Sequence, residues 1–326
     1  MSSATEAVDT DPDTVPQPFP SWPVGWYTVA RGSDLARGAV LCRTLAGAEV
    51  VLFRGDDGRV AAVAAHCPHM GAHLRHGTVV GASVRCPMHH WTVDGGGEVR
   101  RDGTMCGRTR SWRAEEACGL VFVWVGGGEP GPLPLPDGAT ETTWRSGGPV
   151  AVATPWFTLM ISGFDMEHLA AVHGRRLLGE PHIEMVGEQL DERDSRRLRL
   201  RYTSVVTGGG LADRVMAWLG RDGIAVSMTC SGPVFTVDTT MRRRRTRAIL
   251  GLLPVGSGVE AYGSFGVMSN AWLPRLQARI AAWLFIAFLR KDFAIIEGMA
   301  LQTDVRDSGV RAMAAFLRSL PAAIDG

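Results

Sequence analysis

The sequence predicts a two-domain chain of the α+β class, in which a small antiparallel β domain precedes a larger domain of antiparallel sheet and helices. Three observations lead to this prediction. Residues 25–125 consist of short β-rich runs separated by Gly and Asp. A segment rich in Gly and Pro follows at 126–138. Beyond it lie further strand-length runs and then a long helical stretch. A chain of 326 residues has room for about two domains.

Composition and charge narrow the class of protein. Hydrophobic residues make up 45% of the chain and charged residues 21%, as in a globular protein with a buried core. The net charge of +1 gives no general reason to expect nucleic-acid or membrane binding. The start of the chain is acidic, contains Pro and lacks the basic start and apolar core of a secretory signal. We therefore expect a disordered tail over residues 1–20 and a cytoplasmic protein.

The first domain is expected over residues 21–128. Val50–Phe53, a turn at 55–58 and Val60–Ala65 predict a β-hairpin. The run Leu120–Val125 is apolar throughout, which favours a buried strand. Residues 129–148 are then expected to link this domain to the second, at 149–326.

Two loops of the first domain each carry one Cys and one His. Cys67 and His69 form the first pair, and Cys86 and His89 form the second after 16 intervening residues. Two thiolates on one iron and two imidazoles on the other are the ligands of a Rieske [2Fe–2S] centre. Neutral imidazoles raise the reduction potential of such a cluster, and an exposed His edge can pass electrons outward. The pattern therefore predicts an electron relay.

A zinc site would use the same residue types, but zinc fingers usually pair Cys with Cys and His with His. Zinc is the weaker interpretation, because each loop here contributes a mixed pair. Since the ligand set is complete, His66, His73 and His76 are expected to be loop or surface residues. The remaining cysteines follow no spacing pattern and are expected to be reduced packing residues: Cys42, Cys106, Cys118 and Cys230.

The second domain carries a second set of potential metal ligands. Asp165 and His168 are three residues apart and so lie on one side of a helix. His173 follows five residues later, so both imidazoles reach one ion only if the helix ends or distorts, which Gly174 allows. Two imidazoles and a carboxylate form the facial triad of non-haem Fe(II) sites, which leaves positions open for O2.

Together the two motifs resemble the Rieske non-haem iron oxygenases. The resemblance rests on Cys-Pro-His-Met-Gly-Ala-His-Leu from residue 67, Cys-Pro-x-His-x-Trp from residue 86 and Asp-x-x-His-x-x-x-x-His from residue 165. A two-His helix pattern alone is structural more often than metal-binding, but the upstream motif reverses that balance. The chain is most similar to the terminal oxygenase subunits of the homo-oligomeric monooxygenase branch, which includes steroid hydroxylases and desaturases. It departs from the family pattern at His90, usually Gly, and at Ser162, often Asn.

The resemblance implies roles for individual residues. His168 and His173 would bind the mononuclear iron, and a carboxylate from a late segment would complete the site. Asp292 fits that position best, with Glu297 and Asp304 as competitors. A carboxylate buried after an apolar run would be costly without a cation, and iron supplies one.

Asp165 would not bind iron. By the resemblance it lies between His168 and the cluster ligand His89 of a neighbouring subunit, where a carboxylate can hold both imidazoles by their N–H groups. Such a bridge implies a head-to-tail ring of subunits, most simply a homotrimer.

The rest of the second domain is predicted to be a mostly antiparallel sheet, from runs at 183–188, 197–206, 224–230, 234–241, 247–254 and 259–268. The resemblance implies that it is a helix-grip (START-like) sheet whose concave face forms the substrate wall. Candidate lining residues, each of which is more readily explained as core, are Leu159, Ile161, Val205, Met228, Phe235 and Phe265.

Two helices are predicted after the sheet, from about Ala271 to Leu301 and from Val310 to Leu320. The first contains the apolar run Ile280–Leu289, whose ten residues cannot span a bilayer, since a span needs about 20. A buried helix is favoured over contact with a membrane surface.

Arg242–Arg247 is the main cluster of positive charge, and a solvated strand edge is the favoured interpretation. The alternative is a docking surface for an acidic ferredoxin. Nucleic acid is less favoured because no aromatic residues are interleaved.

The function predicted from the resemblance is that of a terminal oxygenase. Electrons from NAD(P)H would arrive through a separate reductase and a ferredoxin, because no stretch of the chain resembles a G-x-G-x-x-G nucleotide site that opens a helix after a strand. With O2, the enzyme would monooxygenate a bulky apolar molecule such as a steroid, a terpenoid or a secondary metabolite. Desaturation, demethylation, oxidative cyclisation and arene cis-dihydroxylation are alternative outcomes. A Rieske electron carrier would explain only the first motif, and a binding protein that performs no chemistry would need neither.

Overall fold

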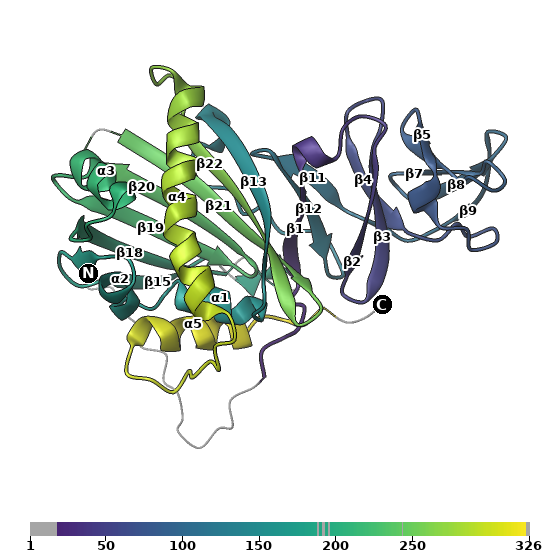
Figure 1. The fold of residues 1–326 in the computed structure, drawn as a ribbon. Coiled ribbons are helices and arrows are strands. Elements are labelled where there is room, and N and C mark those ends of the chain that lie inside the picture. The colour runs from purple at the N-terminus through teal and green to yellow at the C-terminus, as the bar shows by residue number, and fades with distance from the viewer. Residues whose placement is uncertain (1–17, 188, 191–192, 195, 243, 324–326) are drawn as a thin grey trace.

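The computed structural model describes residues 18–323 except residues 188, 191–192, 195 and 243. They form mainly antiparallel sheets, with helices packed on the larger sheet (Figure 1), which confirms the predicted α+β class. Residues 1–17 of the expected tail lie outside the described residues. The end of that segment packs on the second domain, where Phe19 stacks on Phe157 and Pro20 accepts a hydrogen bond from the indole N–H of Trp156.

Small antiparallel sheets build the first domain, and the expected hairpin is present, with Val50 opposite Ala64. In order of pairing, the sheets are β1 (Gly25–Arg31), β12 (Leu120–Val125) and β11 (Ala114–Ala117); then β10 (Ser111–Trp112), β4 (Val60–Ala64), β3 (Ala48–Arg54) and β2 (Val40–Leu45); then β5 (Thr78–Val80), β6 (Ser83–Arg85), β7 (Thr92–Asp94), β8 (Glu98–Arg101) and β9 (Thr104–Arg108). The two loops that carry Cys and His follow β4 and β6.

The second domain is built on one large antiparallel sheet. Its order is β13-β22-β21-β20-β19-β18-β14, and β15 also pairs with β18. The strands are β13 (Thr142–Val152), β14 (Arg175–Leu177), β15 (His182–Val186), β18 (Arg197–Val206), β19 (Ile224–Ser231), β20 (Val234–Met241), β21 (Arg244–Val255) and β22 (Gly258–Met268). A separate pair is formed by β16 (Gln189–Leu190) and β17 (Arg193–Asp194). Strands β18 and β20 have the bounds that the sequence predicts.

Strand β13 is absent from the sequence-based prediction and begins inside the segment expected to be a linker. Its sequence is polar and rich in Gly around residues 146–148, so it shows no apolar alternation. It forms because it pairs with β22 along its length, from Thr142 opposite Met268 to Val152 opposite Val259. Pairing with β22, and not the local sequence, therefore determines that these residues form a strand.

The helices lie on one side of the large sheet and around its end (Figure 1). They are α1 (Trp156–Ser162), α2 (Glu167–Ala171), α3 (Leu211–Leu219), α4 (Pro274–Ile296) and α5 (Ser308–Arg318), with short 3-10 turns η1 (Gly32–Asp34), η2 (Leu74–His76) and η3 (Ala139–Glu141). The prediction missed α3. Helix α5 begins two residues before its predicted start, because the side chain of Asp307 accepts a hydrogen bond from the amide of Val310 and caps it.

Helix α4 crosses the face of the sheet and is shorter than predicted. It starts with Pro274 at its first position and ends before Gly298, whose φ of 74° is left-handed. The expectation of a buried helix is wrong for part of its surface. Ala282 is buried against the sheet in a cluster with Val237 and Phe265, whereas the Trp283 side chain next to it is exposed. None of the described helices is long and apolar enough to cross a membrane.

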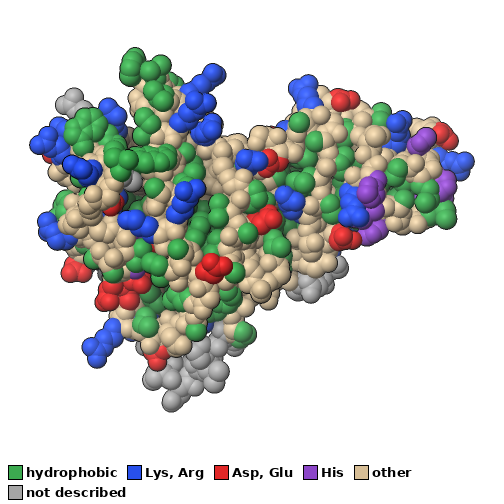
Figure 2. All heavy atoms as spheres, in the orientation of Figure 1, with side chains coloured by type: hydrophobic (Ala, Val, Ile, Leu, Met, Phe, Trp, Pro, Cys, Tyr) green, Lys and Arg blue, Asp and Glu red, His purple; other side chains and the backbone are tan. Residues whose placement is uncertain are grey.

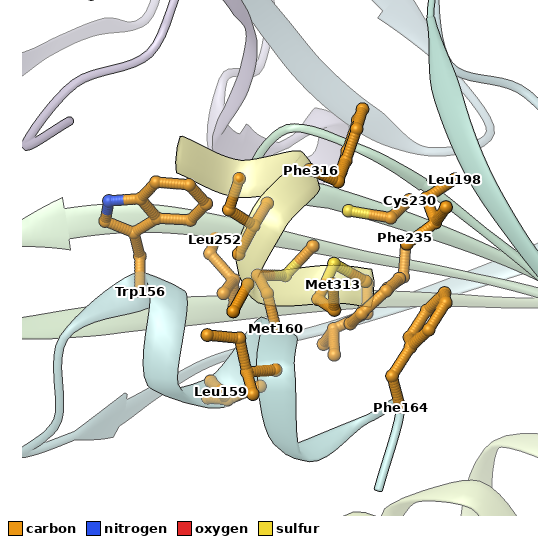
Figure 3. Close-up of a cluster of buried hydrophobic side chains, with 14 of the residues drawn as sticks. Trp156, Leu159, Met160, Phe164, Leu198, Cys230, Phe235, Leu252, Met313 and Phe316 are labelled. Carbon is orange, nitrogen blue, oxygen red and sulfur yellow. The ribbon is translucent and has the colours of Figure 1, made fainter. Parts of the chain in front are cut away.

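Two apolar cores hold these layers together. In one, drawn in Figure 3, Met160 of α1, Leu252 of β21 and Met313 of α5 meet between the helices and the sheet. The other joins the two domains, because Phe122 of β12 packs in the same cluster as Ile249 of β21 and Tyr262 of β22. The first domain is therefore fixed to the back of the large sheet by an apolar interface.

Substitution of Leu252 by Ala should lower the free energy of unfolding by about 2–5 kcal/mol, because the side chain is fully buried and its removal leaves a cavity. Urea unfolding followed by circular dichroism measures this change. Leu276→Ala is the matched control, since Leu276 is 49% exposed. Equal losses in the two variants would contradict this assignment of the core.

Candidate metal centres and substrate cavity

The two cluster loops lie side by side at the end of the first domain. Cys67 and Cys86 are buried, with thiols that form no disulfide. His69 and His89 are exposed, and their ring centroids are 4.6 Å apart. Each loop is closed by a backbone hydrogen bond to its Cys carbonyl from the residue four positions later, with N···O distances of 2.9 Å for the first and 3.1 Å for the second. The thiols thus point inward while the imidazoles lie at the surface.

This donor set fits the ligands of a [2Fe–2S] cluster. Burial raises the pKa of the Cys67 thiol, because removal from water disfavours the thiolate. A bound iron ion would supply the compensating charge. The ring of His69 stacks on Trp91 with centroids 4.2 Å apart, which fixes its orientation. The structure therefore brings together all four residues that the sequence predicts for the cluster.

His90 adopts a left-handed backbone conformation with a φ of 60°. Glycine reaches this region without steric cost, which explains why the family pattern usually has Gly here. For histidine the conformation costs about 1–2 kcal/mol. Its side chain is exposed and so lies at the surface beside the second loop.

The other histidines and cysteines of the first domain have structural surroundings. The Nδ1 atom of His73 accepts a hydrogen bond from the amide of Arg75, 3.1 Å away, and so caps the turn η2. The four cysteines outside the cluster loops are free of disulfides: Cys42, Cys106, Cys118 and Cys230. The expectation of a packing residue is wrong for Cys106, which is exposed.

The second metal centre forms where α2 ends and the last turns of α4 pass it. The Nε2 atom of His173 lies 2.6 Å from Oδ1 of Asp292, and that of His168 lies 3.6 Å from the same oxygen. All three donor atoms are within 4.8 Å of one another. The competitors Glu297 and Asp304 are exposed and do not belong to this group.

Local backbone geometry explains how both imidazoles reach one point. Helix α2 ends at Ala171, as the spacing of the two His residues requires. Gly174 then turns the chain with a φ of 55°. A Cβ atom at this position would lie 2.6 Å from the Cα atom of Gly208, so only Gly fits.

Neighbouring groups fix the orientation of both rings. The Nδ1–H of His168 donates to the backbone carbonyl of Asp165, which leaves its Nε2 atom free to bind a metal. The ring of His173 stacks on Phe288, with centroids 3.6 Å apart. Burial lowers the pKa of His173 and keeps the imidazole neutral, as a metal ligand must be. The donor set therefore fits Fe(II).

Asp165 orients His168 in a way that the sequence did not predict. Its carboxylate oxygen Oδ1 accepts hydrogen bonds from the backbone amides of Glu167 and His168, at 3.0 and 3.2 Å. It thus caps the start of α2, while its carbonyl contacts the imidazole. The side chain is half-buried and borders a hollow that His168 and Asp292 also line.

A cavity of about 360 Å³ opens beside the second centre, between the large sheet and α4. His168 and Asp292 lie in its wall, together with the predicted lining residues Leu159, Met228 and Phe235. The prediction is wrong for Val205, because Tyr202 and Ser204 of β18 face the cavity and Val205 points to the other side of the sheet. Ile161 and Phe265 lie in the packed core, which was the favoured interpretation for each of the candidates.

The cavity wall also contains polar residues that the sequence did not reveal. Arg175 and Tyr202 lie within it, and Arg244 and Arg245 lie at exposed positions of its wall. The sequence offered little signal for Arg175, since an Arg beside a metal-binding motif has no characteristic spacing.

Arg243 lies outside the described residues, and the described arginines of the run at residues 242–247 do not form one solvated edge. Arg247 is only 5% exposed, forms an ion pair with Asp238 (3.2 Å) and donates to the hydroxyl of Thr142 (2.7 Å). The expectation is wrong for this residue, because its strand places it inside the domain. The turn between β20 and β21 lies on the second domain, away from β5–β9 (Figure 1). Among the described charges around this turn, Arg242 pairs with Asp222 (3.1 Å).

Comparison with known proteins identifies the first domain. Residues 25–112 match the model of the Rieske [2Fe-2S] domain. The chain is 32% identical over 173 residues to cholesterol 7-desaturase nvd of Bombyx mori, covering 49% of this chain and 38% of that protein. It is 26% identical over 257 residues to the oxygenase component of 3-ketosteroid-9-alpha-monooxygenase of Rhodococcus rhodochrous, covering 72% and 62%.

The chain therefore carries a Rieske [2Fe-2S] domain. This domain implies a [2Fe–2S] cluster, and the similarity to oxygenase components implies a mononuclear iron as well. The chain spans less than two thirds of the length of the relatives named above. Its fold is that of dicamba monooxygenase, with a TM-score of 0.65 at 18% identity over 90% of this chain and 96% of that one. NdmB of Pseudomonas putida CBB5 also has a TM-score of 0.65, at 16% identity over 92% and 91%.

Substitution of Cys86 by Ser should abolish the visible absorption of the [2Fe–2S] cluster, because a hydroxyl replaces a buried thiolate ligand. Absorption and electron paramagnetic resonance spectra measure the loss. Cys106→Ser is the control, since Cys106 is exposed on β9. A colourless wild-type protein that contains zinc would contradict the cluster assignment.

Substitution of His173 by Ala should remove the mononuclear iron and leave the cluster spectrum intact, because His173 supplies a buried ligand of the second centre only. Iron content by mass spectrometry, compared with cluster absorbance, measures this result. Arg290→Gln is the matched control, since Arg290 lies on α4 near Asp292 but is exposed. Equal iron content in the His173 and Arg290 variants would contradict the site.

Proposed function

We propose that this protein is a terminal oxygenase of the Rieske type that monooxygenates a bulky apolar molecule, of the size of a steroid, a terpenoid or a secondary metabolite. The observation that carries the proposal is the convergence of His168, His173 and Asp292 on one point, with His168 and Asp292 in the wall of a cavity that is otherwise mostly apolar. When bound, the two metal centres would supply electron relay and O2 activation.

The residues of the chain contribute orientation and exclusion of water. The Asp165 carbonyl and the Phe288 ring hold His168 and His173 in ligand geometry before any metal binds. Apolar side chains from α1, the sheet and α4 keep water from the substrate. A cavity of this size and lining suits a compact hydrophobic molecule.

The arrangement of the two centres supports a ring of subunits. The cluster loops lie at one end of the protomer and α2 lies at the other (Figure 1), while the cluster histidines are exposed. In a head-to-tail homotrimer, His89 of one protomer would approach Asp165 of the next, and electrons would cross from His89 through Asp165 to His168. A heterologous interface of this kind closes into a ring.

Electrons must come from a partner. We include in the proposal a separate NAD(P)H-dependent reductase and a ferredoxin, since the relative from Rhodococcus rhodochrous is the oxygenase component of a larger system. Desaturation of a similar substrate is the second candidate, because the Bombyx mori relative is a cholesterol 7-desaturase.

Iron-loaded enzyme with a reductase system and a panel of steroids and polyketides should yield a product with one added oxygen atom, detected by mass spectrometry. Loss of two hydrogen atoms would support desaturation instead. Oxidation that survives in the His173→Ala variant would contradict both candidates, because it would not require the second centre.

Substitution of Asp165 by Asn should slow substrate oxidation about tenfold to hundredfold, while both metal centres remain filled. Asn still caps α2, so the change removes the charge and preserves the fold. Glu167→Gln is the control, since Glu167 is exposed on the first turn of the same helix. The rate of cluster reoxidation by O2 and substrate, measured by stopped flow, would remain unchanged if Asp165 played no part in the transfer.

A further inference from the structure

An arginine in the cavity wall has no partner to account for its burial. Arg175 lies on β14, which pairs with β18, and is 7% exposed. Its Nη1 atom is buried without a hydrogen-bond partner, and no hydrogen bond or ion pair joins its guanidinium to any residue that the structure describes. A charged group in this state is costly unless a ligand of opposite charge completes it.

The nearby carboxylate does not fill this role. Asp213 of α3 is close enough to offset part of the charge of Arg175. Its Oδ2 atom, however, accepts a hydrogen bond from the amide of Gly210 (3.2 Å) and lies 3.7 Å from the ammonium of Lys291. The positive charges of Arg175 and Lys291 therefore outnumber this carboxylate.

Two further hydrogen-bond donors line the cavity on the strand next to Arg175. Tyr202 and Ser204 are two residues apart on β18 and so project from the same face of the sheet. Burial raises the pKa of Tyr202 to about 12, so the phenol keeps its proton and can donate. Together these groups present donors and no anionic acceptor.

The charged residues that line the whole cavity also leave an excess of positive charge. The positively charged lining residues are Arg175, Arg244 and Arg245, and the negatively charged one is Asp292. Asp292 belongs to the metal centre and cannot neutralise the arginines once it holds a cation. Arg244 and Arg245 are exposed, so they would attract an anion toward the cavity before it reaches Arg175.

We propose that Arg175, with Tyr202 and Ser204, forms an anion subsite, and that the substrate is an apolar molecule that carries one oxyanion, a carboxylate in particular. A guanidinium binds a carboxylate through two parallel N–H···O bonds, which matches the planar fork of Arg175. The subsite would fix the orientation of the apolar body relative to the metal centre. This inference rests on the proposed function, because it assumes that the cavity holds the substrate.

Binding of two fluorescent probes to the iron-loaded protein tests the subsite without turnover. Anilinonaphthalene sulfonate and N-phenylnaphthylamine share an aromatic body, and only the first is an anion. The site to be measured is the one that Ala281→Trp removes, because Ala281 lines the cavity on α4. The anionic probe should bind the wild-type protein more tightly than the neutral one, and cholanoate should displace it at lower concentration than cholanoate methyl ester.

Arg175→Gln should weaken binding of the anionic probe about tenfold to hundredfold, since charge-assisted hydrogen bonds are lost. The affinity for the neutral probe should not change. Arg175→Lys should give an intermediate affinity, because charge remains without the fork. Arg176→Gln is the matched control, since Arg176 is the next residue of β14 and is exposed.

The outcomes separate the two proposals. Equal affinity of both probes in all variants would overturn the anion subsite and leave the oxygenase proposal standing. If neither probe binds, both the anion subsite and the oxygenase proposal are overturned, because the cavity would then hold no apolar ligand. If Arg175→Gln fails to fold, the comparison of the acid with its ester on the wild-type protein still decides the question.

Discussion

The structure depends on one costly arrangement, the placement of a carboxylate beside two imidazoles at the edge of an apolar cavity. Asp292 reaches His168 and His173 because α4 crosses the sheet so that its last turns pass beside both imidazoles. His173 turns inward because α2 ends at Ala171. Neither the helix nor the turn would bring these groups together without the core that α1, α5 and the sheet share. A bound cation would relieve the cost, so metal binding and the packing of α4 should stabilise each other.

The two candidate metal centres differ in which of their ligands are buried and which are exposed. In the first domain, buried thiols sit behind exposed imidazoles, so the redox group is sheltered while its outer ligands meet solvent. In the second, His168 and Asp292 lie in the wall of a cavity and are only partly accessible, and His173 is buried. The first arrangement suits contact with another protein, and the second suits reaction with a small molecule.

Much of the site could be predicted because metal ligands follow strict spacing. Cys67, His69, Cys86 and His89 were identifiable from their pairing, and His168 and His173 from the helix and the Gly that follows. Asp292 needed the family resemblance, because it lies 119 residues from His173. Strand β13 and helix α3 could not be predicted, since tertiary pairing creates the first and the second is a short helix on the rim of the cavity. Arg175 gave no signal, because its burial is a property of the sheet and not of its neighbours in sequence.

The apolar cluster between β12 and the back of the large sheet has a consequence for the family chemistry in this chain. Phe122 and Tyr262 are both fully enclosed in it, so no hinge with a solvated gap separates the two domains. The apolar interface therefore fixes the domain that carries the cluster loops in one position relative to the large sheet. In the ring of subunits that we propose, the packing between subunits, and not movement of this domain, would determine which iron atom the cluster can reduce.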